Sequence, residues 1–467
     1  MYDVIATVAS IPYWALVPIT IAGLLLLIIA LRNVEGRAAH FALVAIWLRI
    51  IFDAYFKITI APIGGGMTLN ALLSIATVVV GLVAIDRRNL LIRWMLPVYG
   101  LLIAVLLSHA VNGDIKGALN GVFKAGYLIV LILAVYEGLQ RNGRARFSGA
   151  MLWVVAMLLL LQGAAVGLGV KLVNDIDHSI TYAGGFGHEA NFSVALTLAY
   201  LPTMFAANLS RFWRLTLVIL FTLCLLFANY RTMLIPILPF VAFYCATELM
   251  KIWDKRSRPA MIIGVTSLGV LALFAGAISA GDRLNDFYTL ASNPGQIIRP
   301  TASFTSEERR AGSGRSYVWS YYFEEYTNSA PLQKLVGKGT DSWGAAVVSG
   351  DDGAVRAYPQ NEFVAYLHDY GLFGFTALAL FLGNLIWLSL RSDTVSRSLL
   401  LVLNLVLLLV QISTMPLWLM EGVLLYGLIG GYALYGASQT QRPGRRAEMK
   451  RSSDIRWRQR PKSIGLR

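Results

Sequence analysis

Charged residues are scarce in this sequence of 467 residues. Asp, Glu, Lys and Arg together make up 14% of it, whereas soluble globular proteins carry about 25%. Hydrophobic residues account for 57%, and the mean hydropathy is +0.61. This composition excludes an ordinary soluble domain and favours a protein with many membrane-spanning segments.

Cysteine is also nearly absent, and familiar metal or nucleotide motifs are missing. The two cysteines, Cys224 and Cys245, both fall inside apolar stretches. They are expected to pack as small hydrophobic residues, not to form a disulfide or a metal site. The sequence contains no CxxC, HExxH or P-loop pattern. We therefore expect neither a metal ion nor a cofactor.

The apolar residues gather in about 13 stretches, each long enough to cross a bilayer as a helix of roughly 20 residues. They predict an all-α polytopic membrane protein with about 12–13 transmembrane helices. The expected spans lie near residues 14–31, 41–62, 67–85, 94–112, 118–139, 149–170, 190–207, 215–229, 232–250, 260–280, 371–390, 398–415 and 417–437. The expected organisation is a bundle of about ten helices over 1–280, a long external loop over 281–370, the last transmembrane helices over 371–437 and a basic tail over 438–467.

The net charge of +14 is unevenly distributed, because basic residues crowd every second connection between the spans. This is the positive-inside pattern, and it predicts an external N-terminus and a cytoplasmic C-terminus. The basic tail is expected to contact anionic membrane lipids and not nucleic acid.

The stretch "FANYRTMLIP" places Arg231 between two apolar runs, on a tight turn at the external side. A helix is expected to start near Thr232. Free backbone N–H groups at its N-terminus, together with a guanidinium that can donate two parallel hydrogen bonds, would suit a phosphate. The alternative is an arginine that only extends from the membrane interface into water.

A second arginine, Arg315, lies in the external loop within "GSGRSYVW". Ser313 or Ser316 is expected to cap a helix that runs to about Asn328, with Arg315 in its first turn. Two arginines at facing helix N-termini would suit a pyrophosphate.

Three segments together resemble the O-antigen ligase and polymerase superfamily: "NYRTMLIPIL", "SGRSYVW…APLQKLVGKG" and "YPQNEFVAYLHDYGLFG". Their order, their spacing and the long loop before the last helices also match, over roughly residues 180–375. The resemblance implies a C-type glycosyltransferase in the bacterial inner membrane, with a periplasmic active site. It implies a glycan donor linked to undecaprenyl pyrophosphate, a glycan or lipid-linked acceptor, and no metal ion.

The sequence departs from the family pattern at one position. Ligases carry a His-Asn pair whose histidine is the presumed general base, whereas this chain has Gln360 and Asn361. Because glutamine cannot accept a proton at neutral pH, Glu362 and His368 become the candidate bases, and Arg231 and Arg315 the groups that bind the leaving pyrophosphate. The substitution favours a surface polysaccharide polymerase over an O-antigen ligase.

Other polar residues within or beside the spans are candidates for substrate binding. His188 and Asn191 follow a glycine-rich stretch at the external side, and Lys124 lies near the external start of a span. Arg49, Asp53 and Lys57 are spaced four residues apart, which predicts one helix face. Arg49 is expected either to contact the lipid-linked phosphates or to belong to a structural ion ladder.

A transporter of lipid-linked oligosaccharides is the alternative from another class. A transporter should hold its essential charges near the middle of the membrane, whereas a transferase should gather them at the external rim. The sequence shows no internal repeat of the kind found in many transporters. Arg231 and Arg315 are expected at the rim, which favours the transferase.

Overall fold

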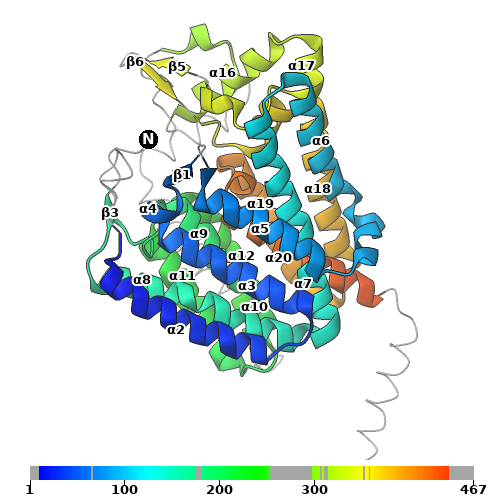
Figure 1. Cartoon of the computed structure of the whole chain (residues 1–467). Helices are drawn as coiled ribbons and strands as arrows, with labels where there is room; N and C mark the ends of the chain where they lie inside the picture. Colours follow the sequence, from blue (N-terminus) through cyan, green and yellow to red (C-terminus); the bar gives the residue numbers. More distant parts are fainter. Residues whose placement is uncertain are drawn as a thin grey trace, which may run out of the picture.

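The structure is a computed structural model that describes residues 10–64, 67–173, 180–251, 297–305, 308–309, 314–345, 347–350, 353–356 and 358–440. These residues fold mainly into helices (Figure 1). The α-helices are α2 (Tyr13–Arg32), α3 (Arg37–Ala54), α4 (Phe56–Thr59), α5 (Leu69–Ala84), α6 (Leu96–Asn112), α7 (Ile115–Val155), α8 (Met157–Gly167), α9 (Glu189–Thr197), α10 (Tyr200–Phe205), α11 (Arg211–Ala228), α12 (Arg231–Leu249), α16 (Arg315–Thr327), α17 (Pro331–Val336), α18 (Glu362–Arg391), α19 (Thr394–Ser413) and α20 (Met420–Thr440).

Short 3₁₀ turns and three small hairpins complete the described structure. The turns are η1 (Arg87–Leu91), η2 (Arg93–Met95), η4 (Thr301–Ser303), η6 (Ser342–Ala345) and η7 (Pro416–Trp418). The antiparallel pairs are β1 (Pro62–Gly64) with β2 (Met67–Thr68), β3 (Leu172–Val173) with β4 (Ile180–Thr181), and β5 (Val347–Gly350) with β6 (Gly353–Arg356).

The all-α membrane class expected from the sequence agrees with these helices. Among the described residues, seven helical segments are long and apolar enough to cross a membrane, judged by length and composition. They are Tyr13–Arg32, Arg93–Asn112, Ile115–Gly167, Arg211–Ala228, Arg231–Leu249, Glu362–Arg391 and Ser396–Ser413. The expected span at 260–280 and most of the basic tail lie outside the described residues, as does residue 313.

Several expected spans are interrupted helices. The chain bends inside α7 at Gly143, whose φ of 73° and ψ of 161° suit glycine alone. The stretch 190–207 forms two short helices, α9 and α10, and the stretch 41–62 is divided at Tyr55 between α3 and α4. Uniform apolar composition therefore predicts where helices form better than where each one breaks.

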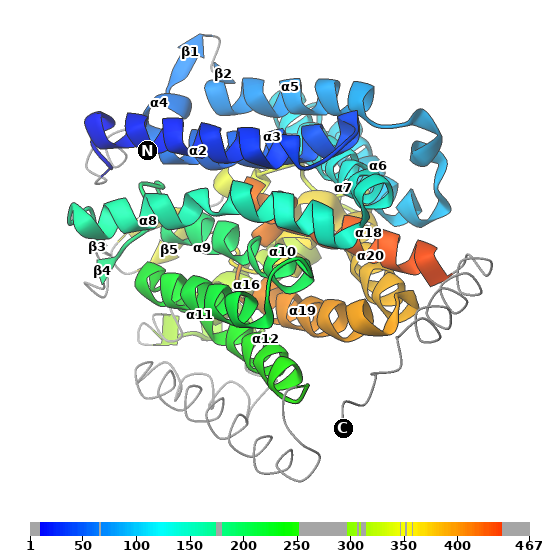
Figure 2. The same cartoon turned by 90° about the horizontal axis from the view of Figure 1, so that it is seen from below.

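Helix α7 occupies the centre of the bundle, where it packs against α3, α5, α6 and α20. Residues 130–135 of α7 are almost fully buried on every face. Close approach of α20 depends on small residues, since a Cβ at Gly431 would lie 2.4 Å from Cγ1 of Val135. Around this centre, α2, α3, α5 and α8 run side by side (Figure 2).

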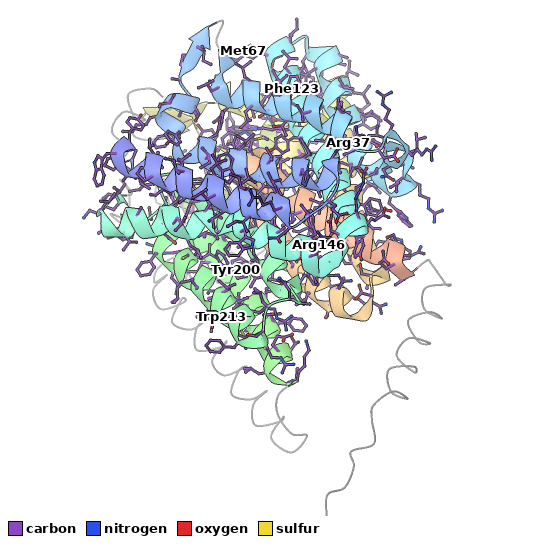
Figure 3. The ribbon with its side chains drawn as sticks, turned by 60° about the horizontal axis from the view of Figure 1, so that its bottom comes forward. Arg37, Met67, Phe123, Arg146, Tyr200 and Trp213 are labelled. Atoms are coloured by element: carbon purple, nitrogen blue, oxygen red, sulfur yellow. The ribbon has the colours of Figure 1, made fainter. Side chains whose placement is uncertain are left out.

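Two ends of the bundle differ in character. At the arginine-rich end, comprising residues 32–37, 85–95, 137–146 and 391–397, Arg146 pairs with Glu35 at 3.1 Å and Arg144 with Asp393 at 2.7 Å. Arg37 and Arg146 extend from this end (Figure 3).

The opposite end, called the loop end, comprises residues 55–64, 67–68, 109–124, 180–189, 229–231, 314–345, 358–370 and 414–421. Side-chain hydrogen bonds join its connections, including His109 to Thr340 at 2.7 Å and Tyr230 to Thr414 at 3.0 Å. The alternate connections that the charge pattern separates are therefore gathered at two different ends of the fold.

Candidate functional site

The turn between α11 and α12 presents Arg231 at the loop end. Asn229 ends α11 in the left-handed conformation, with φ at 48°, and Arg231 is the first residue of α12. Its side chain is half-buried and has no hydrogen-bond or ion-pair partner within the described part of the chain. The expected arrangement, an arginine at a helix N-terminus with free N–H groups, is present.

Arg315 comes to the same region from the external loop. It is the first residue of α16, after Gly314 with φ at 73°, and its Nε donates to Oε1 of Gln360 at 3.2 Å. Arg315 also lies within electrostatic reach of the Tyr230 hydroxyl, whose own pKa is raised by burial. Because Tyr230 precedes Arg231 in the chain, the fold brings Arg315 near the turn that carries Arg231.

The residues at the expected family motif, Gln360 and Asn361, have different local roles. Gln360 is exposed and accepts the hydrogen bond from Arg315. The Asn361 side chain caps α18, because its Oδ1 accepts from the backbone N–H groups of Phe363 at 2.9 Å and Val364 at 3.2 Å. Substrate binding by Asn361 thus remains a prediction, whereas capping accounts for its position.

Backbone strain marks the same region. Within the described chain, positive φ angles at residues other than glycine occur at Asn229, Asp341 and Gln360. Asn229 lies two residues before Arg231, and Gln360 holds Arg315. Such conformations cost roughly 1–3 kcal/mol each and cluster at functional sites. Their grouping at the loop end therefore supports a functional site there.

A small cavity of about 50 Å³ lies at the loop end and is lined by Asp341 and Glu362, among other residues. Glu362 is 1% exposed, and its Oε2 accepts from the backbone N–H of Leu417 at 2.8 Å. Lys124 also lines the cavity. One water requires about 10–15 Å³ of such space, so the cavity can admit water or a single hydroxyl group.

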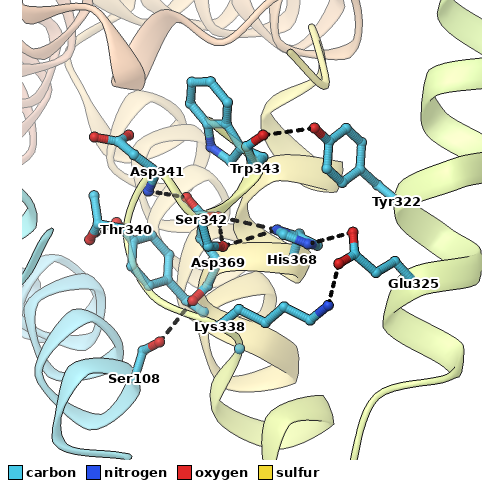
Figure 4. A network of polar contacts seen from close by, with 12 residues as sticks. Ser108, Tyr322, Glu325, Lys338, Thr340, Asp341, Ser342, Trp343, His368 and Asp369 are labelled. Atoms are coloured by element: carbon cyan, nitrogen blue, oxygen red, sulfur yellow. Dashed lines mark hydrogen bonds and ion pairs between the residues drawn. The ribbon is translucent and has the colours of Figure 1, made fainter. Parts of the chain in front are cut away.

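The other candidate base, His368, belongs to a buried polar network that holds the external loop against α18 (Figure 4). Its ring is 3% exposed, with Nε2 at 3.2 Å from Oε2 of Glu325 and Nδ1 at 3.3 Å from Oδ1 of Asp369. Lys338 donates to Glu325 at 2.6 Å, and Ser342 donates to Asp369 at 2.8 Å. Both ring nitrogens are engaged, so the geometry favours an anchoring role for His368 over proton transfer.

The charges in this network are matched to one another. The hydrogen bond from His368, followed by that from Lys338, lowers the pKa of Glu325 to about 2 although partial burial opposes this shift. Glu325 lies on α16, the helix that begins with Arg315. The network therefore fixes the helix that carries one of the two arginines.

The glycine-rich segment before α9 also reaches the loop end. His188 caps α9, with Nδ1 accepting from the backbone N–H of Ala190 at 3.0 Å, and its side chain is 62% exposed. Glu189 lies within electrostatic reach of the Tyr230 hydroxyl. Asn191 is half-buried one turn further along. Both expected binding residues thus lie on the helix that adjoins the arginines, although neither contacts them in the bonds described.

Arg49 is buried in an ion cluster. It pairs with Asp53 at 2.6 Å and with Glu421 of α20 at 3.1 Å, and is 6% exposed. The three residues expected on one helix face are divided between two helices, because α3 ends at Ala54 and Lys57 lies in α4. This arrangement favours the structural alternative for Arg49 over direct contact with a lipid-linked phosphate.

Several residues of this region were not singled out from the sequence. Trp343, Tyr358 and Trp418 form an aromatic cluster, and Asp341 accepts hydrogen bonds from Asn120 and Trp418. The aromatic residues of the external loop indicated that this segment packs against other residues. Trp418 joins the cluster from η7, a different segment, and no motif in the sequence around Trp418 predicts this contact.

Comparisons of the sequence with protein-family models and with curated protein sequences gave no match.

Proposed function

We propose that the protein is a glycosyltransferase that acts on a glycan donor linked to a polyprenyl pyrophosphate, and specifically a surface polysaccharide polymerase at the periplasmic face of the bacterial inner membrane. One observation carries this proposal. Arg231 and Arg315 come from distant segments and begin two different helices, and Arg315 lies within electrostatic reach of Tyr230, the residue before Arg231. Two guanidiniums at helix N-termini suit a pyrophosphate leaving group.

In this proposal the arginines act on the bond that breaks. They stabilise the negative charge that grows on the pyrophosphate as the glycosidic bond to the donor sugar opens. Glu362 takes the proton of the acceptor hydroxyl, whose oxygen forms the new bond to the anomeric carbon. The electron pair of the broken bond leaves with undecaprenyl pyrophosphate.

Transfer to lipid A-core by a ligase is the closest alternative. Gln360 favours the polymerase, because the residue that would act as the base in a ligase is here a partner of Arg315. A transporter is less well supported. Arg49 and Asp53, the buried charges that would serve transport, are engaged with each other and with Glu421.

Deletion of the gene in its host, followed by gel analysis of lipid-linked and surface glycans, tests the proposal. A polymerase predicts loss of long chains and accumulation of single lipid-linked repeats. Long chains that accumulate on undecaprenyl pyrophosphate would identify a ligase. Retention of lipid-linked repeats at the cytoplasmic face would identify a transporter, and unchanged glycans would refute all three functions.

Substitution of the arginines tests the assignment of the site. Arg231→Lys and Arg315→Lys each keep the positive charge but lose the paired hydrogen bonds, so each should reduce chain growth at least about tenfold. Arg146→Lys, in an exposed ion pair at the arginine-rich end, is the matched control and should retain growth. Full growth in both site variants would refute recognition of a pyrophosphate by these guanidiniums.

A further inference from the structure

Three aromatic side chains cluster at the loop end. The ring centroid of Trp343 lies 4.9 Å from that of Tyr358 and 5.2 Å from that of Trp418, while Tyr358 and Trp418 are 6.0 Å apart. Trp343 is 2% exposed, whereas Tyr358 is 43% and Trp418 is 36% exposed. The buried tryptophan therefore supports two rings that remain partly open to the outside.

Two rings of this aromatic cluster lie close in the chain to residues that contact Arg315 and Glu362. Tyr358 lies two residues before Gln360, the partner of Arg315. Trp418 follows Leu417, whose backbone N–H donates to Glu362. In a glycosyl transfer, the reacting sugars must lie between the leaving group and the base, and the cluster contains one ring close in the chain to a partner of each of these groups.

Polar groups border the same rings. Nε1 of Trp418 donates to Oδ1 of Asp341 at 2.8 Å, and Asn120 donates to Oδ2 of Asp341 at 2.7 Å. Asp341 adopts a φ of 60°, a strained conformation that these bonds help to hold. Lys124 lies 5.4 Å from the Trp418 ring centroid. Aromatic faces beside a carboxylate and an amide suit a sugar, which has apolar C–H faces and hydroxyl groups around its edge.

The size of the adjoining cavity limits what can enter it. At about 50 Å³ it is far smaller than the roughly 300–1,000 Å³ of sites that enclose a small molecule. A sugar ring must therefore stay outside, while one of its hydroxyl groups can enter. Trp343 and Trp418 line the cavity together with Glu362, so a ring resting on the exposed aromatic faces lies at the cavity entrance.

We propose that Tyr358 and Trp418 form the subsite for the acceptor sugar, whose ring stacks on them and whose reacting hydroxyl enters the cavity toward Glu362. This inference rests on the proposed glycan transfer and adds the place where the acceptor binds. The hydroxyl gives its proton to the carboxylate of Glu362, its oxygen bonds to the anomeric carbon of the donor, and the pyrophosphate leaves with the electron pair of the bond that breaks.

Paired aromatic and aliphatic substitutions test this subsite in the deletion strain. Tyr358→Leu and Trp418→Leu remove the stacking faces and should reduce chain growth by roughly tenfold. Tyr358→Phe keeps the ring, so its chain growth should clearly exceed that of Tyr358→Leu. Trp14→Leu, which removes a tryptophan that is 71% exposed at the start of α2, controls for general anchoring of aromatic residues at the membrane interface.

Binding of undecaprenyl pyrophosphate to the purified protein in detergent separates this subsite from the donor site. The Leu variants should bind it as the wild type does, and their thermal unfolding should show that they are folded. Normal growth in both Leu variants, or equal loss in Trp14→Leu, would overturn the acceptor subsite. Failure of the proposed function is distinguishable, since gene deletion and the two arginine variants would then also leave the glycans unchanged.

Discussion

At the residue scale, the position expected to hold a catalytic histidine holds a residue that orients an arginine. Gln360 has a φ of 46° and its amide oxygen accepts from Arg315. A left-handed conformation costs an ordinary L-residue roughly 1–2 kcal/mol. A residue in a strained conformation whose described side-chain bond is directed at Arg315 suits a role in function more than one in stability.

Gln360→Gly tests this interpretation. Glycine adopts positive φ without strain, although it adds freedom to the unfolded chain, so the free energy of unfolding should stay within about 1 kcal/mol of wild type. Loss of the bond to Arg315 should nevertheless reduce glycan chain growth by about tenfold or more. Thermal unfolding and glycan gels measure the two effects separately. Wild-type growth in this variant would show that Gln360 does not orient Arg315.

Local sequence reasoning succeeded for residues whose role depends on their immediate neighbours. Arg231 follows a tight turn and Arg315 follows a glycine, so their places at helix N-termini could be predicted from the chain around them. The partners of Glu362 could not be predicted in this way. Lys124 comes from α7 and Leu417 from η7, and only the packing of these distant segments brings them to one cavity.

At the element scale, the external loop is held by charges that α16 and α17 share with α18. Glu325 of α16 contacts both His368 of α18 and Lys338, which follows α17 (Figure 4). The Lys338 backbone N–H also donates to the carbonyl of His368 at 3.1 Å. A loop fixed in this way can keep Arg315 in place, as the proposed binding of a lipid-linked pyrophosphate requires.

Glu325→Gln should weaken this attachment with a defined pH dependence. The folded pKa of Glu325 is about 2, below its ordinary value of 4.5, so its contribution is fully present above pH 4.5 and is lost as the pH falls toward 2. Because the side chain is partly exposed, we expect the free energy of unfolding of the variant to be lower than that of the wild type by roughly 1–2 kcal/mol at pH 6. The difference in stability between the variant and the wild type should become smaller below pH 4.5. Thermal unfolding in detergent measures this difference.

Glu35→Gln is the matched control for this measurement, because it alters an exposed ion pair at the arginine-rich end. Such pairs contribute about 0–1 kcal/mol. A Glu325→Gln variant as stable as this control at pH 6 would contradict the anchoring role.

The bend inside α7 gives a second prediction at this scale. Gly143 combines a φ of 73° with a ψ of 161°, and a Cβ there would meet no atom within 4 Å. Gly143→Ala should therefore destabilise the protein through the backbone alone, by roughly 1–3 kcal/mol. Gly163→Ala in α8 also meets no atom within 4 Å but has helical geometry, so it should be neutral or stabilising by up to about 1 kcal/mol. Equal thermal stability of the two variants would show that the bend does not depend on glycine.

Helix existence was easier to predict than helix continuity, for a physical reason. Apolar composition over some 20 residues reports burial in lipid or protein, and the expected spans within the described residues are indeed helical. Breaks such as those at Gly143 and Tyr55 depend on single backbone conformations. A glycine in an apolar run does not reveal whether it permits close packing, as Gly431 does, or a bend.

At the scale of the whole molecule, the fold has two chemically different ends. Arg144 and Arg146 pair with Asp393 and Glu35 at the arginine-rich end, whereas the loop end contains Arg231, Arg315 and the aromatic cluster. A substrate carried by a membrane lipid would meet Arg231, Arg315 and the aromatic cluster at the loop end only. The one-sided chemistry that we propose would thus depend on the whole arrangement and not on any single motif.

The sidedness of the bundle is the last prediction. The positive-inside rule places the arginine-rich end in the cytoplasm and the loop end outside. In a chain without Cys224 and Cys245, Asn33→Cys marks the first end and Asn328→Cys marks the second, and both positions are exposed. A thiol reagent that cannot cross membranes should label Asn328→Cys on intact cells and Asn33→Cys only after permeabilisation. The reverse pattern would place Arg231 and Arg315 in the cytoplasm, and polymerisation at the periplasmic face would then have to be abandoned even if both arginines proved essential.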